Sequence, residues 1–271
     1  MIDPKIQAEL RDRFNPDGSI LRQHQLRMLE MLKYIDGICK NNDIQYWLSS
    51  GTCLGAVRHG GFIPWDDDVD IEMLKKDYDR LLEIIESNND GQYIVQTHKN
   101  DAGYILPFGK FRDLTSEIVE NPNIDRDYKY KGVFIDIFRM EPSKSKIIAF
   151  IGKYLYLACW TTYKIDNNTL RKICRSFIYF WSFDIIAPIM RFVNNILPKT
   201  SRLRHCFGCT FLAPRDINDI FPLRRISFEG YEFSVPYNAD KYLRDIYGDY
   251  MSFPDTSKIA IHAQRVSFNK A

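Results

Sequence analysis

The sequence lacks several features that would assign it quickly to a class of protein. Its first fifteen residues are polar and charged, without the apolar core of a secretory signal, so we expect a cytoplasmic protein. No internal repeat or low-complexity tract is visible. The net charge of only +2 argues against a polyanionic partner, and the basic residues show no groove-like pattern of the kind that nucleic-acid binding requires.

Cysteine and long apolar runs are also scarce. The six cysteines fit reduced, mostly structural thiols. Cys206 and Cys209 form a CxxC pair, but a zinc site needs about four ligands and no second pair is spaced to supply them. The apolar runs within 146–197 fall short of the roughly 18 uninterrupted residues of a membrane span. We therefore expect no transmembrane helix.

What the sequence does have is a concentration of carboxylates. Asp66, Asp67, Asp68 and Asp70 follow one another within five positions, beside apolar neighbours. From Asp68 onward polar and apolar residues alternate, which is typical of a strand with Asp68 and Asp70 on one face. Two such carboxylates attract a hard divalent cation, which offsets their repulsion. The alternative is a solvated acidic turn.

A later apolar run, GVFIDIF at 132–138, contains Asp136 as its one charged residue. A carboxylate within such a run needs a partner. That partner is either a nearby backbone group or arginine, or a metal ion shared with Asp68 and Asp70. We interpret Asp136 as the third ligand of one metal site.

The remaining patterns predict a mixture of helices and strands. Apolar periodicity indicates helices over 19–41 and 75–87, and short strands near 93–97, 105–112 and 132–138. This mixture favours an α/β or α+β catalytic core. We divide the chain into a core at 1–145, an apolar and basic helical insertion at 146–200, and a C-terminal part at 201–271.

The order of these features is typical of nucleotidyltransferase-fold enzymes, and a longer motif makes the resemblance specific. The chain resembles the LicD family at 50–73, and the resemblance continues at 110–113, at 134–138 and at 234–251, with a late His262. These segments read SGTCLGAVRHGGFIPWDDDVDIEM, KFRD, FIDIF and SVPYNADKYLRDIYGDYM.

Characterised LicD proteins transfer phosphocholine from CDP-choline to sugars of cell-surface glycans, and the fukutin-related ribitol-phosphate transferases are similar. The resemblance implies a nucleotidyltransferase-like mixed sheet flanked by helices. It also implies that Mg²⁺ or Mn²⁺ supports transfer of a substituted phosphate from a CDP-linked donor. The acceptor is expected to be a hydroxyl of a glycan, such as lipopolysaccharide, capsule or teichoic acid, or of its lipid-linked precursor.

Carried over residue by residue, the resemblance makes Asp68, Asp70 and Asp136 the catalytic, metal-binding carboxylates, one of which accepts the acceptor's proton. Asp66 and Asp67 receive supporting roles. The expected substrate-binding residues are Ser50, Gly51, Thr52, Arg58, Lys110 and Arg112. One departure lies after Asp136, where the family often continues Phe-Pro-Leu-Asp and this chain has Phe138, Arg139, Met140 and Glu141.

Two other functions remain open. One is nucleotidyl transfer, which releases pyrophosphate from CTP. The other is a non-catalytic glycan-binding relative, which would gain nothing from three converging carboxylates. For His59 and His262, proton transfer and structural hydrogen bonding are both open.

The segment 143–204 differs from the rest of the chain in charge. It holds eleven Lys and Arg against Asp166 and Asp184, and eleven Phe, Tyr and Trp. Basic residues near anionic lipid contribute about 1 kcal/mol each, and aromatic residues favour the interface. We predict peripheral contact with the inner membrane face, with Arg171, Lys172 and Arg175 among the lipid-facing cations. The alternative is an insertion that covers the catalytic core.

Overall fold

A mixed β-sheet forms the centre of the computed structural model, which describes residues 2–88, 91–143, 145–198, 200–205, 211, 213–254 and 265–268. Its main strand order is β1-β2-β6-β4-β3, and β7 and β8 extend it beyond β6. Strands β2 and β6 are parallel, and the other pairs are antiparallel. The bounds are β1 Trp47–Leu48, β2 Asp70–Leu74, β3 Tyr93–Gln96, β4 Gly109–Asp113, β6 Phe134–Pro142, β7 Arg202–Arg204 and β8 Arg215–Asp216.

Two further strand pairs lie outside this sheet. One joins β5 Ser116–Val119 to β11 Arg265–Phe268, and the other is the hairpin of β9 Arg224–Phe228 and β10 Tyr231–Val235. Helices surround the sheet, as expected for the α/β class: α1 Pro4–Phe14, α2 Ile20–Asn41, α3 Ser50–His59, α4 Lys75–Ser87, α5 Pro122–Asp125, α6 Lys146–Thr161, η1 Thr162–Lys164, α7 Asn168–Tyr179, η2 Phe180–Ile186, α8 Ala187–Ile196, α9 Ile217–Ile220 and α10 Ala239–Tyr247.

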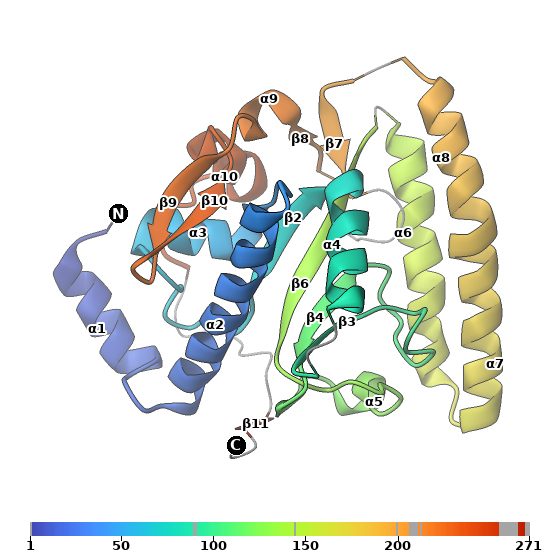
Figure 1. Ribbon diagram of the computed structural model, residues 1–271, viewed down its shortest axis with the longest axis horizontal. Coiled ribbons are helices and arrows are strands. Elements are labelled where there is room, and N and C mark those ends of the chain that lie inside the picture. The colour runs from blue at the N-terminus through green and yellow to red at the C-terminus, as the bar shows by residue number, and fades with distance from the viewer. Residues whose placement is uncertain are drawn as a thin grey trace.

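Helices α2 and α4 cover one face of the sheet, in front of β2 and β6 in Figure 1. Helix α2 begins where Ser19 caps it, since the Ser19 Oγ accepts a hydrogen bond from the Arg22 N–H. Its apolar stripe includes Tyr34, whose ring stacks on Phe111 of β4. This packing fixes which face of each strand is apolar, and it leaves the opposite face free to carry polar side chains.

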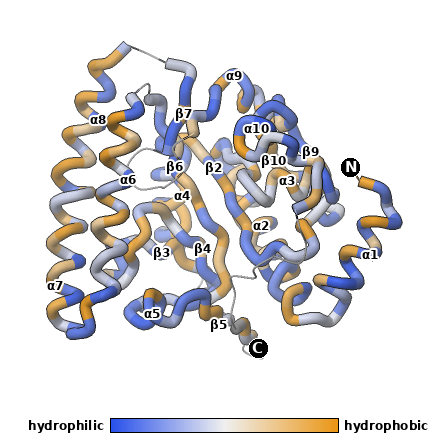
Figure 2. Tube along the Cα trace, turned by 180° about the vertical axis from the view of Figure 1, so that it is seen from behind, coloured by the Kyte–Doolittle hydropathy of each residue, from blue (hydrophilic) through white to orange (hydrophobic). Residues whose placement is uncertain are grey.

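Helices α6, α7 and α8 form a separate layer at one edge of the molecule (Figure 1). Figure 2 shows many hydrophobic residues along these three helices. Through the π-helical segment η2, α7 and α8 join into one helix, Asn168–Ile196, of 29 residues. By length and composition alone this helix is sufficient to cross a membrane. Asp184, Pro188 and Arg191 interrupt the apolar run in the sequence, but the helix continues through all three positions.

A buried ion pair fastens this layer to the rest of the fold. Arg171 of α7 donates two hydrogen bonds to the Asp127 carboxylate, at 2.6 and 2.8 Å, and Arg175 lies 3.1 Å from the same group. All three side chains are at most 6% exposed. Arg171 and Arg175 therefore do not face lipid, contrary to our expectation from the charge balance. The division into three domains stays a prediction.

We predict that Asp127→Ala lowers the free energy of unfolding by roughly 3–5 kcal/mol, because it leaves two buried guanidinium groups without their carboxylate. Chemical denaturation measures this directly. Asp166→Ala, which removes an exposed carboxylate nearby, is the matched control and leaves stability unchanged. Equal stability of the two variants would contradict the assignment of Asp127 as the anchor.

Candidate active site

Three adjacent strands bring two aspartates and a lysine into one row. Asp70 opens β2 and lies beside Asp136 of β6 in parallel register, and Lys110 of β4 lies opposite Asp136. The Lys110 Nζ is 3.1 Å from the Asp136 Oδ1. This row lies on the face of the sheet opposite the apolar residues Ile71 and Ile137, as period two requires.

Asp68 joins this row from a loop. Strand β2 begins only at Asp70, so Asp68 precedes the strand that we expected to hold it. Its charge nevertheless raises the pKa of both Asp70 and Asp66, and its side chain shares a hydrogen bond with Asp66. The Asp66 side chain, from the same loop, lies against the start of α3, where its Oδ2 would be 3.1 Å from a Cβ at Gly51. Glycine at position 51 therefore makes room for this carboxylate.

The carboxylates destabilise one another's charged forms. Burial raises the pKa of Asp70 well above its usual range, and the charges of Asp68, Asp136 and Asp66 add to the shift. Burial also raises the pKa of Asp136, although the ammonium of Lys110 partly opposes it. One lysine thus faces several carboxylates, and the site has an excess of negative charge.

The N-terminus of α3 is fixed against the first residue of β2. The Asp70 N–H donates to the Thr52 Oγ1 at 2.8 Å, and the Ser49 N–H donates to the Asp70 carbonyl at 3.0 Å. Ser50 adopts a positive φ of 44° and begins the helix. Ser50, Gly51 and Thr52, which we expected to bind substrate, form the first turn of α3, and this places backbone N–H groups beside the carboxylates.

The other basic candidates have partners within the fold. Arg58 is 2% exposed and donates to the Tyr250 carbonyl at 2.6 Å, which ties α3 to the C-terminal part. Arg112 is equally buried and donates to Gln96 and to the Gly132 carbonyl. Their role in diphosphate binding stays a prediction. Lys110 is the candidate that contacts a site carboxylate.

Sequence reasoning missed Glu72, which follows Asp70 on the same face of β2. Glu72 is fully buried and accepts hydrogen bonds from Trp47 at 2.8 Å and Tyr242 at 3.0 Å. Burial alone would raise its pKa, but the hydrogen bond from His205 and the charges nearby lower the pKa of Glu72 to about 2. The alternation of Asp68, Asp70 and Glu72 was the signal that would have found it.

Two tyrosines of the C-terminal part complete this side of the site. The Tyr242 hydroxyl lies 3.1 Å from the Ser49 Oγ and so connects Glu72 to the start of α3. Tyr247 forms a hydrogen bond with Ser50, and burial together with the charges of Asp70, Asp66 and Asp68 raises its pKa. The C-terminal segment that resembles the LicD family thus contacts the site directly.

Of the two candidate histidines and the cysteine pair, the structure describes only His59. His59 accepts a hydrogen bond from Arg58 and bonds to Gln7, so its ring is held within the fold. His262, Cys206 and Cys209 lie outside the described residues.

The residues present fit a divalent cation by charge and by chemistry. The site has excess carboxylates, and Lys110 is the cation that the described residues place against Asp136. In the described part of the chain no three His, Cys, Asp or Glu side chains already form a complete ligand set. The arrangement that fits is therefore a cation held by two carboxylates, with substrate phosphate and water completing its coordination shell. This is the usual arrangement for Mg²⁺.

The fold and this arrangement of aspartates beside a helix N-terminus define a nucleotidyltransferase-type domain. A model of the family described as "LicD/FKTN/FKRP, nucleotidyltransferase domain" matches residues 43–173. Residues 43–173 thus form a LicD/FKTN/FKRP-type nucleotidyltransferase domain.

Three relatives illustrate the similarity. The chain is 27% identical over 257 residues to the lipopolysaccharide cholinephosphotransferase LicD of Haemophilus influenzae, covering 86% of this chain and 92% of that protein. It is 44% identical over 48 residues to the human ribitol 5-phosphate transferase FKRP, covering 18% of this chain and 10% of that protein. It is 26% identical over 148 residues to the mannosyltransferase regulator 4 of Saccharomyces cerevisiae, covering 52% and 12%.

We predict that Asp70→Asn raises the melting temperature of the metal-free protein by roughly 2–4 °C, equivalent to about 1 kcal/mol, because it removes a charge held among like charges. Thermal unfolding in the presence of a chelator measures this. Asp245→Asn, on the exposed side of α10, is the control and has no such effect. A lower melting temperature for Asp70→Asn would contradict the electrostatic account.

A second prediction concerns His24 of α2, which is 1% exposed and whose ring nitrogens have no hydrogen-bond partner among the described residues. Burial lowers its pKa from 6.5 to about 4, although Asp67 and Glu120 oppose the shift. Between these two pH values the unfolded chain binds the proton and the folded protein does not. Stability is therefore fully present above pH 6.5 and is lost as the pH falls toward 4.

We expect this component to be of order 3 kcal/mol and to vanish in His24→Phe. Denaturation across this pH range, compared between variant and wild type, isolates it from other titrating groups. Gln23→Leu, an exposed and non-titrating change one position away, leaves the slope intact. An unchanged slope in His24→Phe would show that the ring is protonated in the folded state.

Proposed function

We propose that this protein is a metal-dependent transferase that moves a substituted phosphate, such as phosphocholine or ribitol phosphate, from a CDP-linked donor to a glycan hydroxyl. The glycan is part of the cell surface or its lipid-linked precursor. A cytoplasmic location, at the inner face of the membrane, is part of the proposal.

One observation carries the proposal: the register that aligns Asp70 with Asp136 beside the N-terminus of α3, within the part of the chain that matches the family. Phosphoryl transfer requires little covalent chemistry from the protein. Most of its catalysis is positioning and neutralisation of charge on the phosphates. The names of the Haemophilus and human relatives support phosphocholine or ribitol phosphate as the group transferred.

Each residue has a distinct role in this proposal. Asp70 and Asp136 would hold Mg²⁺ or Mn²⁺, which when bound neutralises negative charge on the donor phosphates. The backbone N–H groups of Gly51 and Thr52 in the first turn of α3 would donate hydrogen bonds to a phosphate oxygen. Lys110 contributes positive charge next to Asp136 and stabilises the leaving nucleotide.

The bonds and protons balance without a further co-reactant. The acceptor oxygen forms a new bond to the phosphorus of the transferred group, and the bond from that phosphorus to the oxygen of CMP breaks. The acceptor's proton passes to one of the site carboxylates. A carboxylate within hydrogen-bond reach of the acceptor hydroxyl can take this proton as a general base.

Two alternatives use the same fold differently. Nucleotidyl transfer would break the bond inside CTP and release pyrophosphate. A regulatory or binding role is favoured by one relative, the yeast mannosyltransferase regulator, whose name denotes regulation. Against that role stand Asp68, Asp70 and Asp136, whose mutual repulsion destabilises a protein that binds no cation.

Product analysis decides among these functions. The purified protein is incubated with Mg²⁺, a glycan acceptor and a panel of CDP-alcohols, and released nucleotide is measured. We predict release of CMP and none of pyrophosphate from CTP. Pyrophosphate release would support nucleotidyl transfer, and no turnover with any donor would support the regulatory role.

We further predict that Asp136→Asn lowers the rate of CMP release by roughly 10²- to 10⁴-fold without lowering the melting temperature. The reason is that Asp136 acts on the reacting groups, while its charge is not needed for folding. Glu117→Gln, an exposed carboxylate on β5, is the matched control. A lowered melting temperature with unchanged specific activity would make Asp136 a structural residue instead.

A further inference from the structure

The helical layer exposes an apolar surface that the proposed reaction does not use. Eight of its large apolar side chains are more than half exposed, Leu170 and Ile189 among them, and the other six define the α6–α8 face. They are Ile147 (72%), Tyr154 (55%), Ile173 (62%), Phe177 (63%), Phe192 (68%) and Ile196 (69%). In the most apolar stretch of the helix Asn168–Ile196 only 22% of the residues are buried. Soluble monomers rarely expose so large an apolar surface without a partner.

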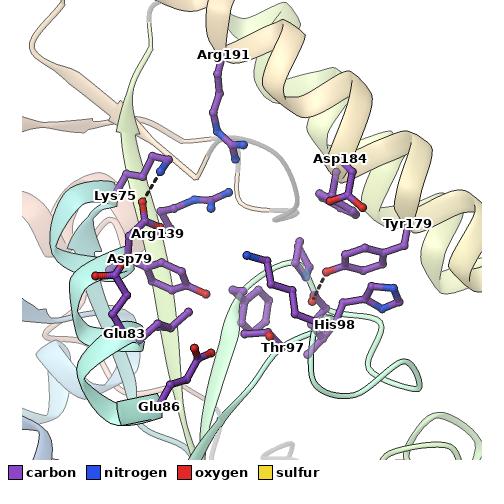
Figure 3. Close-up of a pocket in the computed structure, with 17 residues that line it drawn as sticks. Lys75, Asp79, Glu83, Glu86, Thr97, His98, Arg139, Tyr179, Asp184 and Arg191 are labelled. Atoms are coloured by element: carbon purple, nitrogen blue, oxygen red, sulfur yellow. Dashed lines mark hydrogen bonds and ion pairs between the residues drawn. The ribbon is translucent and has the colours of Figure 1, made fainter.

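The arginines and Asp184 of the same helix point the other way. Figure 3 shows Tyr179, Asp184 and Arg191 projecting from this helix into a cavity of about 620 Å³, toward α4 and β6. Arg191 pairs with Glu141 at 3.0 Å, and Arg171 pairs with Asp127. Segment η2 winds more widely than an α-helix, so Asp184 turns into the cavity while apolar residues stay on the outside.

The exposed cations that remain are lysines. Lys146 at the start of α6, Lys164 in η1 and Lys172 in α7 are exposed, and Lys146 and Lys172 directly precede Ile147 and Ile173 of the apolar surface. Of the two acidic residues in 143–204, Asp184 faces the cavity and Asp166 lies in the loop before α7. The α6–α8 face thus combines apolar and aromatic side chains with positive charge, which is the composition of helices that lie at a lipid interface.

A second copy of the chain fits this surface less well. A symmetric interface places the same patch on both subunits. It would bring basic rims together with few acidic residues to pair with them, and like charges that face each other are costly. Anionic lipid head groups supply the missing negative charge.

A membrane-spanning arrangement of the helix also fits less well. Arg171, Arg175 and Arg191 are paired with Asp127 and Glu141, which belong to the part of the fold around the sheet. Spanning would remove these charges from their partners and place them in hydrocarbon, at a cost of several kcal/mol. With the ion pairs intact, the helix lies along the surface of a bilayer, over a length of about 40 Å.

We propose that the α6–α8 face docks this protein onto the surface of an anionic lipid bilayer, with its apolar side chains in the interface and its lysines on the head groups. The proposal does not depend on the transfer reaction, because binding to lipid requires no catalysis. It revises the sequence-based expectation, since Lys164 and Lys172 replace Arg171 and Arg175 as the lipid-facing cations.

Cosedimentation of the full chain with vesicles tests the proposal. Wild type binds vesicles of phosphatidylglycerol and phosphatidylcholine at low salt, binds less as the salt concentration rises, and binds pure phosphatidylcholine weakly. Lys164→Glu with Lys172→Glu weakens binding to anionic vesicles by about tenfold or more. Ile173→Ser, Phe177→Ser and Phe192→Ser combined abolish binding to both kinds of vesicle.

Matched variants elsewhere on the surface control for charge and apolarity. Lys5→Glu with Lys76→Glu makes the same change of charge away from this face, and Ile6→Ser with Ile20→Ser removes exposed apolar side chains from α1 and α2. Both bind like wild type. Because every substituted residue is exposed, the melting temperatures stay unchanged, and measuring them excludes unfolding as the cause of lost binding.

Three results would overturn the proposal. The first is wild-type protein that ignores vesicle charge or vesicles altogether. The second is a dimer in light scattering that the Ile173, Phe177 and Phe192 substitutions dissociate, without vesicle binding, which would make a second copy the occupant. The third is resistance of the cellular protein to extraction from membranes by alkaline carbonate, which would show that the helix spans the bilayer.

Discussion

Repulsion among carboxylates that the fold holds in one place is the interaction on which the rest of this structure depends. The parallel register of β2 and β6 fixes Asp70 beside Asp136, and the loop before β2 adds Asp66 and Asp68. These groups cannot separate without breaking the sheet. Interactions with other parts of the fold must therefore offset this repulsion. A bound cation together with phosphate relieves it, so the same carboxylates favour binding of the cation.

Much of the surrounding structure serves to hold the acidic loop against this repulsion. Gln25 of α2 donates to the Asp66 carbonyl at 2.9 Å. Glu229, at the tip of the β9–β10 hairpin, accepts the Phe62 N–H and pairs with Arg22. A Cβ at Gly61 would overlap the Glu229 carboxylate, so the loop approaches the hairpin closely. The N-terminal helix and the C-terminal hairpin thus meet at the loop that carries the site.

Local patterns predicted the elements whose structure is decided locally. Helix α4 lies at Lys75–Ser87, where its apolar spacing indicated a helix, and α2 occupies nearly all of the predicted range 19–41. The face on which Asp136 lies also followed from the period of its strand. In these segments spacing, caps and turn residues all favour the same conformation.

Features that depend on distant partners could not be derived in this way. Arg58 resembles a surface cation until Tyr250, 192 residues later, accepts its hydrogen bond. The network around Glu72 likewise needs Tyr242, which lies in the C-terminal helix. The long helix depends on the π-helical segment η2, which contains Asp184 and keeps the helix continuous there. Sequence spacing describes periodicity within one element, but it does not show which side chains of other elements satisfy a buried charge.

The most direct test of the central claim is the binding of Mn²⁺, followed by its paramagnetic effect on the relaxation of water protons. The account predicts weak binding to the protein alone and tighter binding when a CDP-alcohol is present, because two carboxylates need phosphate oxygens to complete the coordination. It also predicts that both Asp70→Asn and Asp136→Asn abolish this tightening. Mn²⁺ binding that is the same in wild type and in both variants would contradict the account.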